Sequence, residues 1–279
     1  MRYNFLLLFM TSIILLSCQK EKGTITDQPV PVPTPPDPPV PAVFLKDIVI
    51  PNVPSPYYHF EYNTEGKAIF SSFASDLFRY DIIYAGNKIT EMRNNLGFGS
   101  DTLRYFYDNA GRVAAVNYID LTGRLYIKVF FTYDGAKLIK LERWRIVGTN
   151  FVVNKTMTLS YYPDGNLKEI IDHRPAVNGQ TESTLIDRFE QYDDKINVDG
   201  FSLIHNDFFD HVVLLPGVQI QKNNPLKEIV TGDGTNYIVN YTYLYNDNKA
   251  PLTKTGNLVF TNGANAGTSF ETQSMFSYY

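Results

Sequence analysis

A short motif recurs along the chain and fixes how long its structural elements are. An aromatic stretch ends in a Tyr, a short turn rich in Asp, Asn and Gly follows, and an apolar residue opens the next stretch. Successive motif tyrosines up to residue 192 lie 22, 23, 26, 29 and 30 residues apart, which suits two strands and two turns. Asp, Asn and Gly tolerate the positive φ that tight hairpin connections require. Each repeat therefore predicts a β-hairpin. The motif tyrosines are Tyr62, Tyr84, Tyr107, Tyr133, Tyr162, Tyr192 and Tyr245.

The stretches between these turns alternate in the way of half-buried strands. In residues 125–133 the apolar positions 125, 127, 129 and 131 alternate with Tyr126, Lys128, Phe130 and Thr132. The connections are too short for parallel crossovers, so neighbouring strands pair antiparallel. We predict an all-β fold for residues 43–279, an up-and-down meander of about 12–16 strands in one strongly curled or barrel-like sheet. The expected helical exception is Leu203–Leu215, where apolar residues fall near helical spacing.

Charges on both faces of the expected strands argue against a sheet that crosses a membrane. In residues 138–145 the sequence LIKLERWR places Lys, Glu or Arg at both odd and even positions. A membrane-spanning barrel needs an uninterrupted apolar outer band, and a charge on the lipid face costs about 2–4 kcal/mol at the midplane. The sequence therefore predicts a soluble, curled sheet.

The N-terminal sequence is typical of a secretory signal, and this signal ends immediately before the single cysteine. Residues 1–17 hold an early Arg2, a short apolar run and a small residue, a pattern too short to span a bilayer comfortably. Residues 15–18, Leu-Leu-Ser-Cys, resemble the bacterial lipobox, which implies cleavage before Cys18 and lipid attachment to it. The alternative is an incidental Cys in an uncleaved anchor. Gln19, in place of Asp, resembles an outer-membrane sorting signal, and the leaflet stays open.

A proline-rich segment separates this anchor from the folded part. Residues 23–42 read GTITDQPVPVPTPPDPPVPA, and such a sequence adopts polyproline II and acts as a semi-rigid spacer. We therefore divide the chain into a signal peptide (1–17), an anchor and tether (18–42) and a single all-β domain (43–279), which is long enough to bury a substantial core.

The sequence offers little that points to catalysis. A formal net charge of −4 excludes an obvious electrostatic nucleic-acid binder. The histidines at 205 and 211 flank two aspartates, but their spacing fits no established metal motif. Asp172-His173 lacks a partner nucleophile motif, and the carboxylate pairs Asp193-Asp194 and Glu182/Asp187 fall in expected loops. We predict no enzyme, no cofactor and no metal site, with a glycan hydrolase as the alternative.

The hairpin motif and the N-terminal features together carry a family resemblance. The Tyr-Asp-x-x-Gly-x-Leu pattern resembles the YD repeats of RHS proteins. The whole arrangement, with its lipobox-like start and Pro-rich tether, resembles a Bacteroidetes-type secreted lipoprotein family of unknown function with a porin-like fold. The resemblance covers nearly all of residues 43–279. It implies a bacterial cell-envelope location and supplies no activity, ligand or catalytic residue.

Two classes of function remain open besides the hydrolase. The first is a non-catalytic envelope protein, held on the membrane by its N-terminal lipid, that binds a glycan, a peptide or a protein. The second is a structural or assembly scaffold of the envelope. Three rings fall on strand faces that should be polar, namely Phe106, Tyr126 and Phe130. Exposed apolar surface often marks an interaction site, so these residues are the candidate ligand-binding positions.

Overall fold

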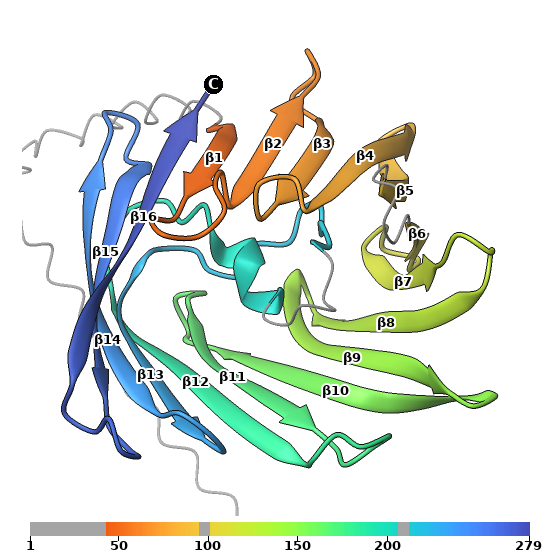
Figure 1. Cartoon of the computed structure of the whole chain (residues 1–279). Coiled ribbons are helices and arrows are strands. Elements are labelled where there is room, and N and C mark those ends of the chain that lie inside the picture. The colour runs from red at the N-terminus through yellow and green to blue at the C-terminus, as the bar shows by residue number, and fades with distance from the viewer. Residues whose placement is uncertain (1–42, 95–100, 206–211) are drawn as a thin grey trace, which may run out of the picture. The chain divides into compact units, whose positions relative to one another are not determined.

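The computed structural model describes residues 43–94, 101–205 and 212–279. Within these residues the chain forms sixteen strands in one closed antiparallel barrel, in which each strand pairs with the next and β16 closes on β1 (Figure 1). The all-β, up-and-down and barrel-like predictions are confirmed. The strands are β1 (Leu45–Val49), β2 (Tyr58–Tyr62), β3 (Ala68–Phe73), β4 (Phe78–Ala85), β5 (Lys88–Asn94), β6 (Thr102–Tyr107), β7 (Val113–Ile119), β8 (Leu125–Asp134), β9 (Lys137–Val147), β10 (Asn150–Tyr161), β11 (Leu167–Arg174), β12 (Ser183–Tyr192), β13 (Pro225–Gly232), β14 (Tyr237–Tyr245), β15 (Pro251–Phe260) and β16 (Ser269–Tyr278).

The described part of Leu203–Leu215 does not form the predicted helix. The helical residues that the structure describes form a short 3₁₀ turn, η1 (Gly200–Ile204), and the predicted residues 206–211 lie outside the described part. Residues 212–215 have no regular structure, and the Leu214 N–H donates to a side chain of the barrel wall, the Tyr105 hydroxyl. Contacts with the wall therefore take the place of helical hydrogen bonds. Among the described residues, no helix is long and apolar enough to cross a membrane.

In several of the recurring turns, one carboxylate or amide side chain holds the backbone. Asp108 Oδ1 accepts the backbone N–H groups of Ala110 and Arg112, both at 2.9 Å. The Gly111 N–H closes the turn onto the Asp108 carbonyl at 3.0 Å, and Gly111 has a φ of 80° that L side chains rarely adopt. The same side-chain pattern recurs with Asn63, Asp120 and Asn246 as the acceptor. The hairpin interpretation of the motif is confirmed at these turns.

Tyrosines near the strand ends, four of them motif tyrosines, tie their hairpins to the preceding ones. The Tyr133 hydroxyl donates to the Val113 carbonyl at 2.8 Å, and the Tyr107 hydroxyl donates to the Ile89 carbonyl at 2.8 Å. Each acceptor is the first or second residue of the strand that follows an earlier turn. We call the tyrosines that share this contact the tyrosine belt: Tyr84, Tyr107, Tyr133, Tyr161, Tyr192, Tyr243 and Tyr278.

A cation from the preceding turn covers several rings of the belt. The Lys88 ammonium lies 4.8 Å from the centroid of the Tyr107 ring, and the Arg112 guanidinium lies 4.8 Å from that of Tyr133. Lys67 over Tyr84 and Lys137 over Tyr161 repeat the arrangement at 5.8 and 5.2 Å. Each such contact adds about 0.5–1 kcal/mol at a partly exposed site. The basic residue before the apolar position of the motif therefore has a structural role.

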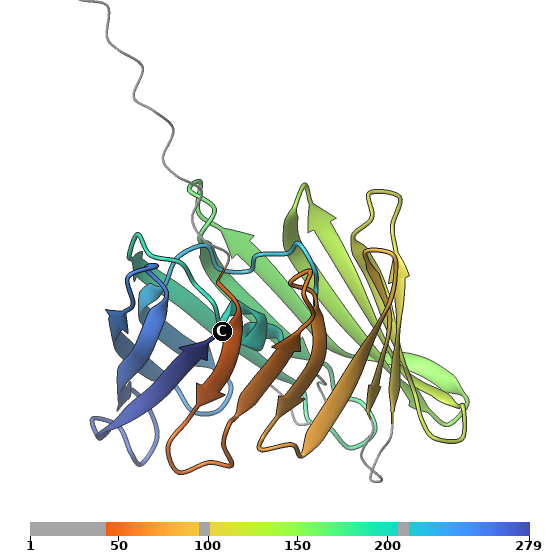
Figure 2. The ribbon, with the colours of Figure 1, turned by 90° about the horizontal axis from the view of Figure 1, so that it is seen from above.

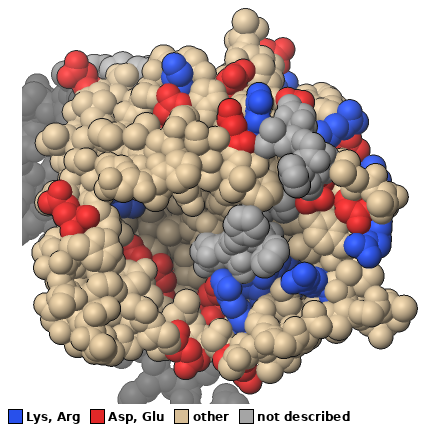
Figure 3. Space-filling model, viewed as in Figure 1, with Lys and Arg blue, Asp and Glu red and all other residues tan. Residues whose placement is uncertain are grey.

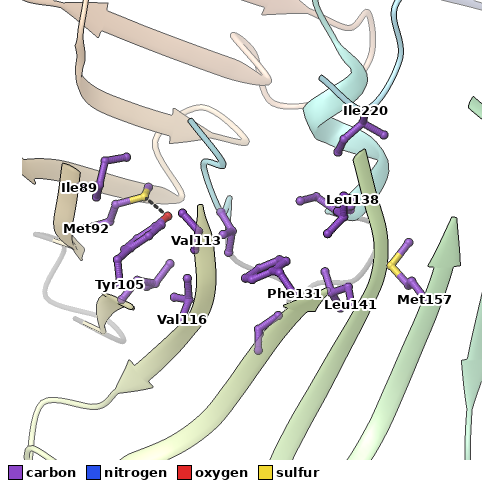
Figure 4. Packing of buried hydrophobic residues seen from close by; sticks show 14 of the residues in the cluster. Ile89, Met92, Tyr105, Val113, Val116, Phe131, Leu138, Leu141, Met157 and Ile220 are labelled. Atoms are coloured by element: carbon purple, nitrogen blue, oxygen red, sulfur yellow. Dashed lines mark hydrogen bonds between the residues drawn. The ribbon is translucent and has the colours of Figure 1, made fainter. Parts of the chain in front are cut away.

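The interior of the barrel is apolar over much of its wall. Inward side chains from β4 to β12 form one buried cluster that includes Leu103, Val116 and Leu138, none of which is exposed to solvent. Figure 4 shows Val116, Leu138 and other side chains of this cluster on the inner side of the wall, with Ile220 contributed by the segment between β12 and β13. A ribbon view at right angles shows the wall strands surrounding that segment (Figure 2). The apolar residues of the alternation thus face the lumen.

Charged side chains lie on the outside of the same strands. Glu91 of β5 pairs with Arg104 of β6 at 3.3 Å, and Glu169 of β11 pairs with Arg188 of β12 at 2.6 Å. On β9, Lys140 and Glu142 are partly exposed and lie 3.0 Å apart, whereas Arg143 is buried. Both faces of this strand carry charge, as the sequence analysis expected for residues 138–145.

Candidate functional site

The chain leaves the wall after β12 and returns to it at β13, and we call the described residues between these strands, 193–205 and 212–224, the inner segment. Hydrogen bonds between its two ends hold it in a loop: the Asn224 N–H donates to Asp193 Oδ1 at 3.1 Å, and the Asn224 amide donates to the Ile196 carbonyl. Asn197 Oδ1 accepts the Gly200 N–H at 2.8 Å. A Cβ at residue 200 would lie 2.9 Å from that oxygen, so the close approach requires glycine.

Side chains of the wall fix the inner segment in the lumen. The Tyr58 hydroxyl lies 2.9 Å from His205 Nδ1, and the Lys254 ammonium lies 3.0 Å from the Asp199 carboxylate. The Phe201 ring packs edge-on against Phe60 of β2 with centroids 5.3 Å apart. The inner segment therefore forms part of the core, and two cavities lie against it.

One of these spaces is an apolar cavity of about 700 Å³ between the inner segment and strands β1–β5. It lies by the turns that contain Gly66 and Asn87, and we call it the rim cavity. Its size is within the range of small-molecule sites. Its lining consists of Val43, Leu45, Phe60, Tyr62, Gly66, Lys67, Ala68, Tyr84, Asn87, Ile89, Ile196, Asn197, Val198, Phe201, Leu214, Leu215 and Pro216.

The chemistry of the rim cavity is that of an apolar binding site with few polar groups. Lys67, Asn87 and Asn197 supply its amine and amide side chains. Burial, with the neighbouring phenols of Tyr279 and Tyr84, raises the pKa of Tyr62 to about 12, so this hydroxyl is neutral at physiological pH. Few groups in the lining can satisfy a polar ligand, and an unpaired polar group in such a space is costly. The cavity suits an apolar or aromatic group.

Two of the three candidate positions from the sequence lie together on the outer wall. Phe106 of β6 and Phe130 of β8 are 44% and 39% exposed. Ala115 of β7 pairs with both of them, so the three residues form a row across three strands. Phe130 also contacts Trp144 of β9, with ring centroids 6.3 Å apart. We call these four residues the outer patch.

The third candidate, Tyr126, does not belong to the outer patch. The ladder between β7 and β8 shifts register between Tyr118 and Ile119, opposite residues 125–127. Such a bulge interrupts the alternation of side chains. Tyr126 is half-buried, packs against the inner core beside Tyr118 and donates its hydroxyl to Asp101. The prediction that Tyr126 shares a polar face with Phe130 is therefore wrong.

The other clusters singled out from the sequence are dispersed or engaged. Asp172 pairs with Arg174 at 3.0 Å, whereas His173 lies 3.1 Å from Glu182. Asp194 is exposed and pairs with Lys195. The aspartates between the histidines at 205 and 211 lie outside the described residues. Over the described part of the chain, no group of three or more His, Cys, Asp or Glu side chains is arranged to hold a metal ion.

Comparison with solved structures identifies the fold. A porin-like protein from Bacteroides uniformis superposes with a TM-score of 0.56 at 10% sequence identity, covering 85% of this chain and 95% of that one. A porin-like protein from Bacteroides vulgatus gives a TM-score of 0.52 at 14% identity, covering 79% and 92%. The shared property is the fold. No protein-family model and no curated protein matches the sequence.

Sequence reasoning missed the rim cavity because no local pattern marks it. Its lining combines the start of the domain, strands β1–β5 with two of their turns, and a segment more than a hundred residues later. The one available signal was the looser form of the motif at Tyr192, where the following residues lack the glycine of the five preceding motif turns. That looser form coincides with the start of the inner segment.

Proposed function

We propose that this chain is a lipid-anchored protein of the bacterial cell envelope, and that its barrel binds an apolar portion of a peptide or protein in the rim cavity without catalysis. The observation that carries the proposal is the apolar cavity of about 700 Å³ beside the inner segment. Its lining includes Leu45, Phe201 and Leu214, which come from the wall and from the inner segment. Because the lining comes from the wall and from the inner segment, the fold of the whole domain determines the shape of the cavity.

The composition of the cavity favours a peptide over a glycan. A sugar ring presents several hydroxyl groups, and each needs a hydrogen-bond partner when it leaves water. The rim cavity offers few side chains of that kind, whereas apolar and aromatic walls suit Leu-like or Phe-like groups. A peptide whose backbone stays in solvent while one or two apolar side chains enter the cavity fits this lining.

The envelope location is supported by the N-terminal pattern and by the outer wall. Lipidation at Cys18 would hold the protein on a membrane, because lipid chains stabilise binding by about 0.8 kcal/mol per buried methylene. Ion pairs such as Glu91–Arg104 and Glu169–Arg188 lie on the outside of the barrel, where a membrane-spanning barrel needs an apolar band. We therefore place the barrel beside the membrane, at the end of the tether.

A scaffold role is the second candidate, and the tyrosine belt favours it. Much of the tyrosine surplus that the sequence presents is used in contacts between hairpins, as with Tyr107 and Tyr133. Contacts within the fold therefore account for these tyrosines, and no ligand is required to explain their number. The outer patch is the exposed aromatic surface that a scaffold would offer to a partner protein.

Binding of the fluorescent apolar dye N-phenyl-1-naphthylamine to the purified protein tests the rim cavity against the outer patch. Ala68→Phe fills the rim cavity, whereas Ala115→Glu places a charge between Phe106 and Phe130. We expect Ala68→Phe to weaken dye binding by about tenfold or more and Ala115→Glu to leave it unchanged, with a Leu- and Phe-containing peptide competing with the dye. Thermal melting of both variants confirms that they are folded.

The reverse pattern, with loss only in Ala115→Glu, would move the site to the outer patch. Absence of saturable dye binding in the wild type would favour the scaffold. Release of products from a glycan polymer would favour the hydrolase. The anchor is tested separately: labelled palmitate should enter the wild type and not Cys18→Ser, and equal labelling of both would contradict the anchor.

A further inference from the structure

A second cavity, of about 330 Å³, lies on the other side of the inner segment, against β11–β14, and we call it the inner polar cavity. The end of the barrel that faces the reader in Figure 3 is hollowed at its centre, and Asp and Glu side chains lie on the wall of the hollow. The lining of the inner polar cavity is Met157, Ile170, Asp172, Arg174, Leu185, Asp187, Ser202, Leu203, Glu228, Val230 and Tyr237.

The strand register places two carboxylates side by side on the inner face. Asp187 of β12 pairs with Val230 of β13, and Glu228 is two residues from Val230 on the same strand face. Residues in this diagonal relation have Cα atoms about 7–8 Å apart, within reach of acidic side chains. Asp187 and Glu228 therefore form a pair inside the barrel, and both line the same cavity.

The described residues supply this pair with too little positive charge. The guanidinium of Arg174 pairs with Asp172 at 3.0 Å, and the Lys254 ammonium pairs with Asp199 at 3.0 Å. Each cation thus has a carboxylate of its own. Asp187 and Glu228 are two further acidic groups on the wall. Lys254 interacts electrostatically with both of them as well as with Asp199, so one positive charge serves three carboxyl groups.

The hydrogen bonds of the pair are also incomplete. Glu228 accepts the hydroxyl of Tyr241. Asp187 Oδ1 is buried and receives no hydrogen bond from any described residue. Burial raises the pKa of Asp187 well above its usual value, and the Glu228 charge adds to the shift. Burial likewise raises the pKa of Glu228. A buried acceptor without a donor is costly, so the pair is suited to receive a proton or a cation.

The fold keeps Tyr241 in position for this contact. Gly256 of β15 pairs with Tyr241, and a Cβ at residue 256 would lie 2.9 Å from the Tyr241 ring and 2.8 Å from Val239. The glycine therefore lets the ring lie flat against β15, and the hydroxyl reaches Glu228. The site combines a fixed donor on one carboxylate with an open acceptor on the other.

We propose that the inner polar cavity binds an organic ammonium ion, which donates N–H groups to Asp187 and Glu228 while its body lies against Tyr237 and the apolar wall. An ammonium supplies both the missing charge and the missing donors, and hydrogen bonds to charged groups are the stronger ones. The face of Tyr237 offers a further attraction for a cation. The two carboxylates fall short of the oxygen-rich ligand sets that hold Ca²⁺ or Mg²⁺.

The test compares cyclohexylamine with cyclohexanol, which share a ring that fits beside Ile170, Leu185 and Val230 but differ in charge. Binding to the full-length protein is measured by calorimetry at neutral pH. We expect cyclohexylamine to bind at least about tenfold more tightly than cyclohexanol. Asp187→Asn and Glu228→Gln should each reduce amine binding by about tenfold or more.

The matched control is Glu190→Gln, which removes a carboxylate of the same strand that pairs with Lys227 on the outer face. It should bind the amine as the wild type does. Equal affinity for the amine and the alcohol, or amine binding that survives both Asp187→Asn and Glu228→Gln, would overturn the proposal. No measurable amine binding would overturn it too, and would leave the pair sharing a proton. The outcome is independent of dye binding in the rim cavity.

Discussion

Removal of one hydroxyl from the tyrosine belt tests the role assigned to the repeated motif. The substitution Tyr133→Phe deletes the donor to the Val113 carbonyl, a contact of 2.8 Å, and keeps the ring. The Arg112 guanidinium over that ring, 4.8 Å from its centroid, stays in place. A hydrogen bond of this kind contributes about 0.5–1.5 kcal/mol net. We therefore expect the free energy of unfolding to fall by about 1 kcal/mol.

The measurement is chemical denaturation of the purified protein, supported by thermal melting. For a domain of this size, 1 kcal/mol corresponds to about 2–4 °C in Tm. The matched control is Tyr57→Phe, because the Tyr57 hydroxyl makes no hydrogen bond to any described residue. The double variant Tyr107→Phe/Tyr161→Phe removes two hydroxyls from separate hairpins and should lose the sum of the two single effects. If Tyr133→Phe and Tyr57→Phe were equally stable, the belt would contribute packing and no hydrogen-bond energy.

Two further substitutions test the inner pair and a turn. Because the folded-state pKa of Asp187 is raised above its unfolded value, its contribution to stability is present below about pH 4 and is lost as the pH rises. Asp187→Asn should therefore be more stable than the wild type by a margin that grows above pH 4, and a margin independent of pH would contradict this. Gly66→Ala should lose roughly 1–3 kcal/mol, because Gly66 has a φ of 75° and its Cβ would lie 2.7 Å from the Phe44 ring. Gly86→Ala, with a φ of 60° and open space, should lose less in the same denaturation assay.

Local turn chemistry made the hairpins predictable from the sequence. Asp108, Gly111 and the apolar Val113 act within six residues of one another, and their hydrogen bonds follow from residue type alone. Closure of the barrel depends instead on the pairing of β1 with β16, whose partners Leu45 and Tyr278 are more than two hundred residues apart. A repeated hairpin pattern indicates a meander and leaves its closure undetermined. The sequence pattern could therefore predict a barrel-like sheet, but it could not predict that β1 pairs with β16.

The candidate sites were less predictable because they depend on contacts between distant segments. Tyr192-Asp193 resembles the start of another hairpin turn, but Asp193 receives the Asn224 N–H from the far end of the inner segment. Tyr126 alternates with its neighbours in the sequence, yet a bulge at this residue of β8 turns it toward the core. Asp187 was noted as a loop carboxylate, and the structure places it within β12, facing the lumen. That prediction of a loop position was wrong.

The inner segment explains why the rim cavity and the inner polar cavity have opposite characters. A ring of sixteen strands encloses more space than its own side chains fill, and the described residues of the inner segment occupy part of it. Where the segment presents Phe201 and Leu214 to β1–β5, the remaining space is apolar. Where it presents Ser202 and Leu203 to β11–β14, the wall contributes Asp187 and Glu228, and the remaining space is acidic. Since adjacent residues of one short turn, Phe201 and Ser202, line the two spaces, a ligand that shifts η1 in one cavity must change the lining of the other.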